Sequence, residues 1–168
     1  HHPDLLDFLE LKKNIGSEFN RTRDLFLALW ISDLFMKQVE SDGEWYFMCP
    51  DTCNNLNNVY GEEYDQLYWK YVKEKKYTKK IKARDAMKAI LDAQIETGVP
   101  YIAYKDSVNR KSNQKHLGTI KSSNLCIEIM QYSDHNEYAT CNLASIPINK
   151  YLIPFVPTKE FTIYTKKD

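Results

Sequence analysis

The 168 residues of this chain are enough to bury one hydrophobic core, and their number predicts a single domain. The 23 lysines and arginines balance 23 aspartates and glutamates, so no net charge attracts the chain to nucleic acid or a membrane surface. Aromatic residues make up 13% of the sequence, which argues against disorder, and the longest apolar run, residues 25–31, is too short to span a bilayer. Without a secretory signal, we expect a cytoplasmic protein, and a start at two histidines favours a fragment of a longer chain.

Helices and strands alternate over the first two thirds of the chain, which indicates an α/β fold. The run 73–82 carries six lysines, and we interpret it as a solvated linker. Periodicity and terminal residues predict a helix at 3–16, a buried strand at 23–31, a short helix from Ser32 or Asp33 to Val39, a strand at 44–48, helices at 61–76 and 82–98, and a strand at 100–104.

A polar loop at 105–118 is predicted to lead into a β-hairpin, with strands at 123–132 and 137–146 around the turn 133–136. Successive side chains of a strand point to opposite faces, so Asn124, Cys126 and Glu128 would share one face. Leucine and isoleucines occupy the positions between them. A polar, reactive front on an apolar back is typical of a strand that lines an active site.

Cys141 falls on the predicted return strand, so we expect a second thiol near Cys126. A lone cysteine on an apolar strand is usually a small buried hydrophobic residue. Here its neighbours favour a functional interpretation. Burial of Asn124 and Glu128 would cost several kcal/mol unless they are paired or face a polar substrate.

Two other classes of function stay open at this point. His116 or His135 could activate Cys126 as the nucleophile of a hydrolase, although no third, orienting group is evident. In a plain interaction module, the cysteine strand would be core and the lysine run at 73–82 would be the binding surface.

Cys49 and Cys53 have the spacing of half a zinc site. No second Cys or His pair at ligand spacing follows them, so we interpret them as loop cysteines and expect no metal in this chain.

Seven segments then carry a family resemblance, and they are DFLELKKN, RDLFLALWISDLFMK, MCPDTC, GEEYDQLY, ETGVPYIAYKD, NRKSNQKHLGTIKSSNLCIEI and CNLASI. Together they closely resemble the large subunit of class I ribonucleotide reductase of the eukaryotic type. The resemblance implies that residues 1–152 are part of the family's ten-stranded α/β barrel, in which a finger loop carries a radical cysteine into the centre. Residues 153–168 match nothing and are left as an unassigned tail.

The resemblance also implies roles for the residues of the predicted hairpin. Cys126 corresponds to the cysteine that becomes a thiyl radical and abstracts the 3′ hydrogen of the substrate. Glu128 corresponds to the carboxylate that takes the proton of the 3′-hydroxyl, and Asn124 to the amide that hydrogen-bonds the ribose. Cys141 corresponds to one cysteine of the pair that is oxidised to a disulfide. Ser122 departs from many members, which have a further cysteine there.

For the parent protein, the resemblance implies an enzyme that reduces ribonucleoside diphosphates for DNA synthesis. Its metal-containing small subunit supplies the radical, and thioredoxin or glutaredoxin supplies the electrons. The full-length subunit is expected to be a homo-oligomer under allosteric control, with ATP and deoxynucleotide effectors bound outside this chain. The partner of Cys141 and the radical-transfer tyrosines also lie outside it, so we expect the isolated chain to be inactive.

Overall fold

The computed structural model describes residues 1–152, so the predicted unassigned tail, residues 153–168, lies outside the described residues. Within residues 1–152, four short strands form two separate two-stranded sheets. β1 (Ala28–Ile31) pairs in parallel with β4 (Tyr101–Tyr104), and β2 (Glu44–Phe47) pairs antiparallel with β3 (Lys79–Lys82). The parallel pair requires a long crossover, which here runs through helices and the second sheet. The fold is therefore α/β, although the strands of this part of the chain do not close a barrel.

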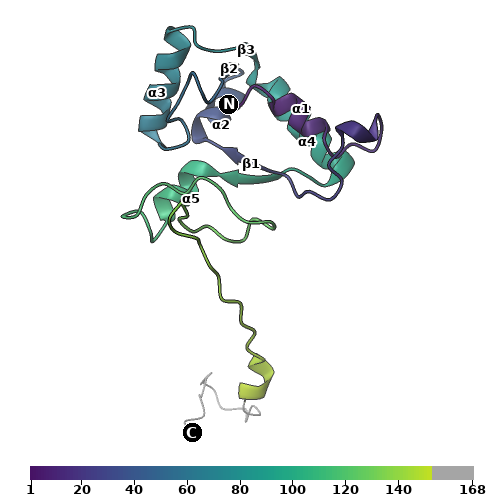
Figure 1. Cartoon of the computed structure of the whole chain (residues 1–168), viewed down its shortest axis with the longest axis vertical. Helices are drawn as coiled ribbons and strands as arrows, with labels where there is room; N and C mark the ends of the chain where they lie inside the picture. The colour runs from purple at the N-terminus through teal and green to yellow at the C-terminus, as the bar shows by residue number, and fades with distance from the viewer. Residues whose placement is uncertain (153–168) are drawn as a thin grey trace, which may run out of the picture.

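The helices lie around these sheets, and α1 (Leu5–Glu10) lies beside α4 (Ala83–Thr97) (Figure 1). After α5 (Lys105–Lys111) the chain first loops beside that helix and then runs out from the packed part toward a last single turn (Figure 1). None of the helices in residues 1–152 is both long enough and apolar enough to cross a membrane. The described helices are α1 (Leu5–Glu10), α2 (Asp33–Glu40), α3 (Glu62–Lys73), α4 (Ala83–Thr97) and α5 (Lys105–Lys111), with 3-10 turns η1 (Glu18–Asn20) and η2 (Ile148–Tyr151).

Local signals explain where the predicted helices begin and end. The Ser32 hydroxyl accepts a hydrogen bond from the Phe35 amide at 3.3 Å and caps α2. Gly98 ends α4 with a left-handed φ of 77°, a conformation that glycine adopts without steric cost. The predicted α2, α3 and α4 and the strands β2 and β4 are confirmed, with small differences at their ends. The predicted buried strand at 23–31 is confirmed only in part, because β1 begins at Ala28 and the preceding Leu25 and Phe26 are 56% and 53% exposed.

Aromatic side chains form the centre of the core. The Trp45 ring stacks on the Tyr68 ring with centroids 4.7 Å apart, and Phe35 meets Trp45 edge-on at 5.0 Å. The Tyr68 hydroxyl accepts from the Tyr46 amide at 2.8 Å and donates to the Tyr46 carbonyl at 3.0 Å. This hydroxyl therefore ties α3 to β2, and burial raises the pKa of Tyr68 well above its usual value.

A buried polar cluster lies at the carboxyl ends of the parallel strands β1 and β4. The carboxylate of Asp106, which is fully buried, accepts hydrogen bonds from the Asp33 amide at 2.5 Å and the Gly61 amide at 2.6 Å. Beside it, the Lys105 ammonium donates to the Leu56 carbonyl at 2.6 Å and lies 4.3 Å from the Tyr64 ring centroid. Burial lowers the pKa of Lys105 to about 8, and the nearby Asp106 opposes part of that shift.

Three predictions about the first 118 residues are wrong. The first helix ends at Glu10 rather than continuing toward Gly16. The lysine run at 73–82 is not only a linker, because its last residues form β3 against β2. The predicted polar loop 105–118 begins with α5, whose buried side chains are polar and find partners in other segments. A sequence pattern of apolar spacing cannot reveal a helix of this kind.

The predicted β-hairpin is also wrong, since neither 123–132 nor 137–146 forms a strand. Leu125, which was to lie on its apolar back, is 62% exposed. Within residues 1–152 no sheet or helix covers that face, and a hairpin without a covered apolar face is marginal in water. Only the turn survives, as the Asp134 amide donates to the Glu137 carbonyl at 2.9 Å.

We predict that Asp106→Asn destabilises the fold by about 2–4 kcal/mol, because the new NH₂ group faces one of the two half-buried backbone N–H donors and leaves it without an acceptor. Thermal unfolding measures the effect. As a control, Ser107→Ala removes only an exposed hydrogen bond from Arg110 and should change stability by less than about 0.5 kcal/mol. An unchanged melting temperature for Asp106→Asn would contradict the assigned role of the carboxylate.

Candidate functional site

Asn124, Cys126 and Glu128 lie on a turn within residues 121–131, a segment called the 121–131 loop below. The carbonyl oxygen of Asn124 accepts from the Ile127 amide at 3.2 Å, and its Oδ1 accepts from the Ile129 amide at 3.1 Å. Its Nδ2 donates to Oε1 of Glu128 at 2.7 Å. One asparagine thus closes the turn with its backbone and with both ends of its side-chain amide.

The backbone at Ile127 is strained. Its φ is 64°, in the left-handed region that β-branched residues avoid. Such a conformation costs about 1–3 kcal/mol and persists only where neighbouring contacts impose it. The hydrogen bonds of Asn124 supply such contacts, because one is accepted from the Ile127 amide and the other from the Ile129 amide.

The prediction that the three side chains share one face of an extended strand is therefore wrong. The turn nevertheless brings Asn124 and Glu128 together, four residues apart, which a strand would have done less closely. Cys126 lies between them at the tip, where it is exposed, and among residues 1–152 its thiol has no hydrogen-bond partner. The loop thus presents an amide–carboxylate pair and a free thiol to solvent.

Cys141 is exposed and lies on the segment that precedes η2. Its only polar contact among the described residues is a long one, 3.9 Å from Sγ to the Asn142 carbonyl. The strand pairing that was to bring Cys141 close to Cys126 is absent. The two thiols are free and belong to separate segments.

The histidines of the hydrolase alternative do not support it. His116 is exposed, and His135 lies in the turn before Asn136, whose amide nitrogen is 3.0 Å from its ring. Neither ring contacts the thiol of Cys126 through a hydrogen bond among the described residues. A cysteine nucleophile without an adjacent base is weakly activated.

The cysteines of CPDTC serve the fold. Cys53 is buried, and its thiol donates to the Lys76 carbonyl at 3.3 Å. Cys49 is half-buried. Across residues 1–152, no three His, Cys, Asp or Glu side chains come close enough together to hold a metal ion.

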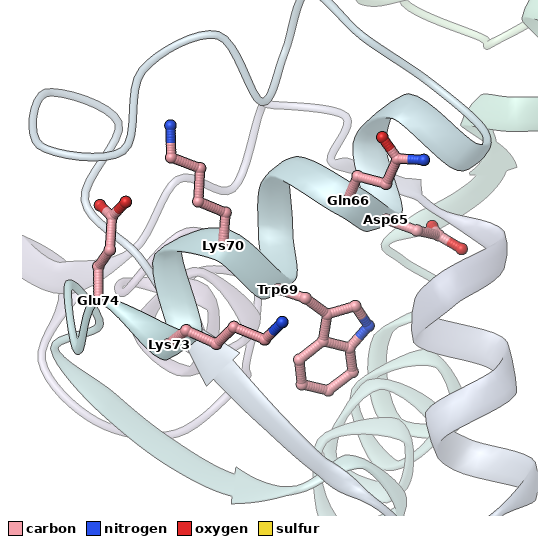
Figure 2. A pocket seen from close by; sticks show the side chains of 6 residues that line it. All are labelled: Asp65, Gln66, Trp69, Lys70, Lys73 and Glu74. Atoms are coloured by element: carbon pink, nitrogen blue, oxygen red, sulfur yellow. The ribbon is translucent and has the colours of Figure 1, made fainter.

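Of two hollows on the surface of residues 1–152, only one adjoins the predicted site. A hollow of about 610 Å³ runs along α3, where Asp65 pairs with Lys37 and the Trp69 ring meets Tyr46 edge-on. Its six lining side chains spread along the helix without converging on one point (Figure 2). A second hollow of about 590 Å³ lies between α5 and the end of the 121–131 loop, and it is lined by Ser107, Val108, Lys111, Ser112, Asn113, Gln114, Met130 and Gln131.

Sequence reasoning missed the residues that hold the 121–131 loop, among them Asn109 and Gln114. Both lie in the stretch that was predicted to be a plain polar loop. Asn109 is buried and bonds to the backbone of Ile120, while Gln114 accepts from the amide of Tyr132. The only available signal was the Lys105, Asp106 and Asn109 spacing, which puts three polar residues on one helical face.

We predict that Asn124→Ala opens the turn and speeds hydrogen exchange at the Ile129 amide by roughly five- to tenfold, the equivalent of one lost hydrogen bond. Glu128→Gln keeps an oxygen that can accept from Nδ2 of Asn124 and leaves the bond from the Ile129 amide intact, so it is the matched control, with exchange near the unsubstituted rate. Hydrogen exchange read by NMR distinguishes the two. Equal protection of Ile129 in both variants would argue against the turn.

Comparison with known proteins identifies what this chain is similar to. The family model described as "Ribonucleotide reductase, barrel domain" matches residues 1–167. The ribonucleoside-diphosphate reductase large subunit of Variola virus (isolate Human/India/Ind3/1967) is 61% identical over 152 residues, which cover 90% of this chain and 20% of the viral protein. The large subunit of Caenorhabditis elegans is 57% identical over 153 residues, or 91% of this chain and 19% of that protein. The large chain of Neurospora crassa is 57% identical over 151 residues, or 90% and 16%. The chain spans about a fifth of the length of the curated relatives that it matches.

Proposed function

This chain belongs to the ribonucleotide reductase family, as part of its barrel domain, and we propose that it supplies the radical cysteine of a ribonucleoside-diphosphate reductase large subunit. The observation that carries the proposal is the amide–carboxylate pair of Asn124 and Glu128, 2.7 Å apart, on either side of the exposed Cys126 thiol. A hydrogen-bond donor and an acceptor set beside a free thiol suit a sugar diol. Serving as a plain interaction module would require none of these groups.

The proposed substrate is a ribonucleoside diphosphate, whose 2′- and 3′-hydroxyls replace the direct bond between Asn124 and Glu128. The thiyl radical of Cys126 takes the hydrogen atom from C3′ and becomes a thiol. Glu128 accepts the proton of the 3′-hydroxyl, as a general base does. The amide nitrogen of Asn124 donates to the ribose, which orients the sugar over the sulfur.

Two electrons must then reach the substrate. The 2′-hydroxyl takes up a proton and leaves as water, while Cys141 and a second cysteine outside this chain give up two electrons and two protons as they form a disulfide. Cys126 returns its hydrogen atom to C3′, which regenerates the thiyl radical. The exposure of Cys141 supports this role, because a redox-active thiol must be reachable by its partners.

The wider assignments follow from the family. A metal-containing small subunit supplies the oxidising equivalent to Cys126, and thioredoxin or glutaredoxin reduces the disulfide. The full-length subunit is a cytoplasmic homo-oligomer whose activity responds to ATP and deoxynucleotides bound outside this chain. The product serves DNA replication.

We predict that Cys126→Ser, in a large subunit that carries this chain, abolishes nucleotide reduction and leaves substrate binding intact. A serine O–H bond is much harder to cleave homolytically than a thiol S–H bond, so serine cannot carry the radical. Turnover is measured with the small subunit present, and Cys49→Ser is the control that should remain active. Retention of even a few per cent of the activity by Cys126→Ser would refute the assignment.

We predict a different defect for Cys141→Ser. Hydrogen abstraction by Cys126 still proceeds, so a label at C3′ exchanges with solvent through the thiol, but normal deoxynucleotide is not formed. The measurement is label release in parallel with product analysis. If Cys141→Ser blocked both processes, or neither, Cys141 would not belong to the reducing pair.

A further inference from the structure

We propose that Asn109 and Gln114 are positioning residues that fix the two ends of the 121–131 loop, so that Cys126, Asn124 and Glu128 keep a common orientation. This proposal rests on the function proposed above for the loop. It adds two amide side chains that do not touch the substrate and act through the backbone.

The leading end of the loop is fixed by Asn109 of α5. Its Oδ1 accepts from the Ile120 amide at 2.7 Å, and its Nδ2 donates to the Ile120 carbonyl at 3.0 Å. The same Nδ2 donates to the Lys105 carbonyl at 2.9 Å, so the amide is also fixed to its own helix. Both partners are almost fully buried, Asn109 at 2% exposure and Ile120 at 1%. Two hydrogen bonds to one residue act as a short ladder and set the direction of the chain where the loop begins.

The trailing end is fixed by Gln114, just beyond α5. Its Oε1 accepts from the Tyr132 amide at 2.7 Å. Gly118 lies directly against the ring of Tyr132, since a Cβ at this position would be 2.5 Å from ring carbon Cε2, and its φ of 153° also suits glycine. The two ends of the loop are therefore held close together, beside the same stretch of chain.

Between these two points the loop has no other polar attachment to the described part of the protein. Each remaining hydrogen bond of residues 121–131 is internal to the loop, as between Ser123 and the Ile129 carbonyl at 2.6 Å. The turn at Ile127 is thus held together by its own hydrogen bonds, and only the contacts of Ile120 and Tyr132 fix its orientation. If the hydrogen bonds of either residue were lost, the turn could tilt without unfolding.

Orientation matters for the proposed chemistry because the sulfur must approach one hydrogen atom of the ribose while Glu128 meets the adjacent hydroxyl. A displacement of about 1 Å from a distant substitution can lower a rate a hundredfold. A positioning residue should therefore affect kcat far more than KM, and leave the melting temperature unchanged.

Gln114 permits a sharp test because the only hydrogen bond of its side chain in the described part of the protein is the one that its Oε1 accepts. Gln114→Glu keeps the accepting oxygen, whereas Gln114→Met keeps the length of the side chain and loses the acceptor. In a full-length large subunit assayed with its small subunit, we expect Gln114→Met to lower kcat by roughly tenfold to a hundredfold with KM within about twofold. Gln114→Glu should stay within about threefold of the unsubstituted enzyme, and the exposed neighbour Lys115→Ala is the surface control.

Hydrogen exchange supplies a readout that is independent of activity. The Tyr132 amide should exchange faster in Gln114→Met than in Gln114→Glu, at equal melting temperature. Wild-type kcat in Gln114→Met, or equal loss of kcat in both variants, overturns the proposal.

Asn109→Leu is the companion variant. Because a substitution at this buried position can cause misfolding, the result for Gln114 is the one that tests the proposal. If Cys126→Ser retains activity, the proposed function fails, whereas an inactive Cys126→Ser with a normal Gln114→Met rejects only the positioning role.

Discussion

The carboxylate of Asp106 is the interaction on which the arrangement of this chain depends. It is fully buried and bridges the Asp33 amide at the start of α2 and the Gly61 amide ahead of α3. A buried charge is tolerated only where hydrogen bonds replace its water, and the two half-buried amides gain a strong acceptor in return. Each group therefore requires the others, and three segments that are distant in the sequence meet at one side chain. The exposed ion pair of Arg110 with Asp33 adds little to this contact.

Helix α5, which contains Asp106, also connects this buried carboxylate to the candidate site. Lys105, Asp106 and Asn109 face the interior, while Arg110 and Lys111 are exposed, so the helix buries a polar face. Its hydrogen bonds run to Leu56 on one side and to Ile120 on the other. The position of the 121–131 loop therefore depends, through α5, on the carboxyl ends of the parallel strands β1 and β4. The site is therefore attached to a helix, although its own residues lie in a turn.

Much of the fold could be predicted from the sequence because apolar periodicity records burial against a hydrophobic layer. The helix at 82–98 and the strand at 100–104 are recognised in that way, and Gly98 marks the end of the helix. α5 was missed because it is stabilised by tertiary hydrogen bonds from polar side chains, which leave no apolar stripe. The alternation at 124–128 predicted a strand, but no layer covers Leu125 in residues 1–152, and Asn124 offers the backbone a turn instead. The identity of the site residues came from the family resemblance, whereas their local geometry required the structure.

The turn also explains how one asparagine can serve both the loop and a substrate. Asn124 closes the turn with its carbonyl oxygen and with Oδ1, which accept from the Ile127 and Ile129 amides. Only its Nδ2 is directed to Glu128. Under the proposed function, a ribose that takes over Nδ2 and the carboxylate leaves the two closing bonds unbroken. The backbone at Ile127 therefore keeps its conformation when the hydrogen bond between Asn124 and Glu128 is replaced by hydrogen bonds to the two hydroxyls of the ribose. Substrate binding then does not require the loop that carries Cys126 to change its shape.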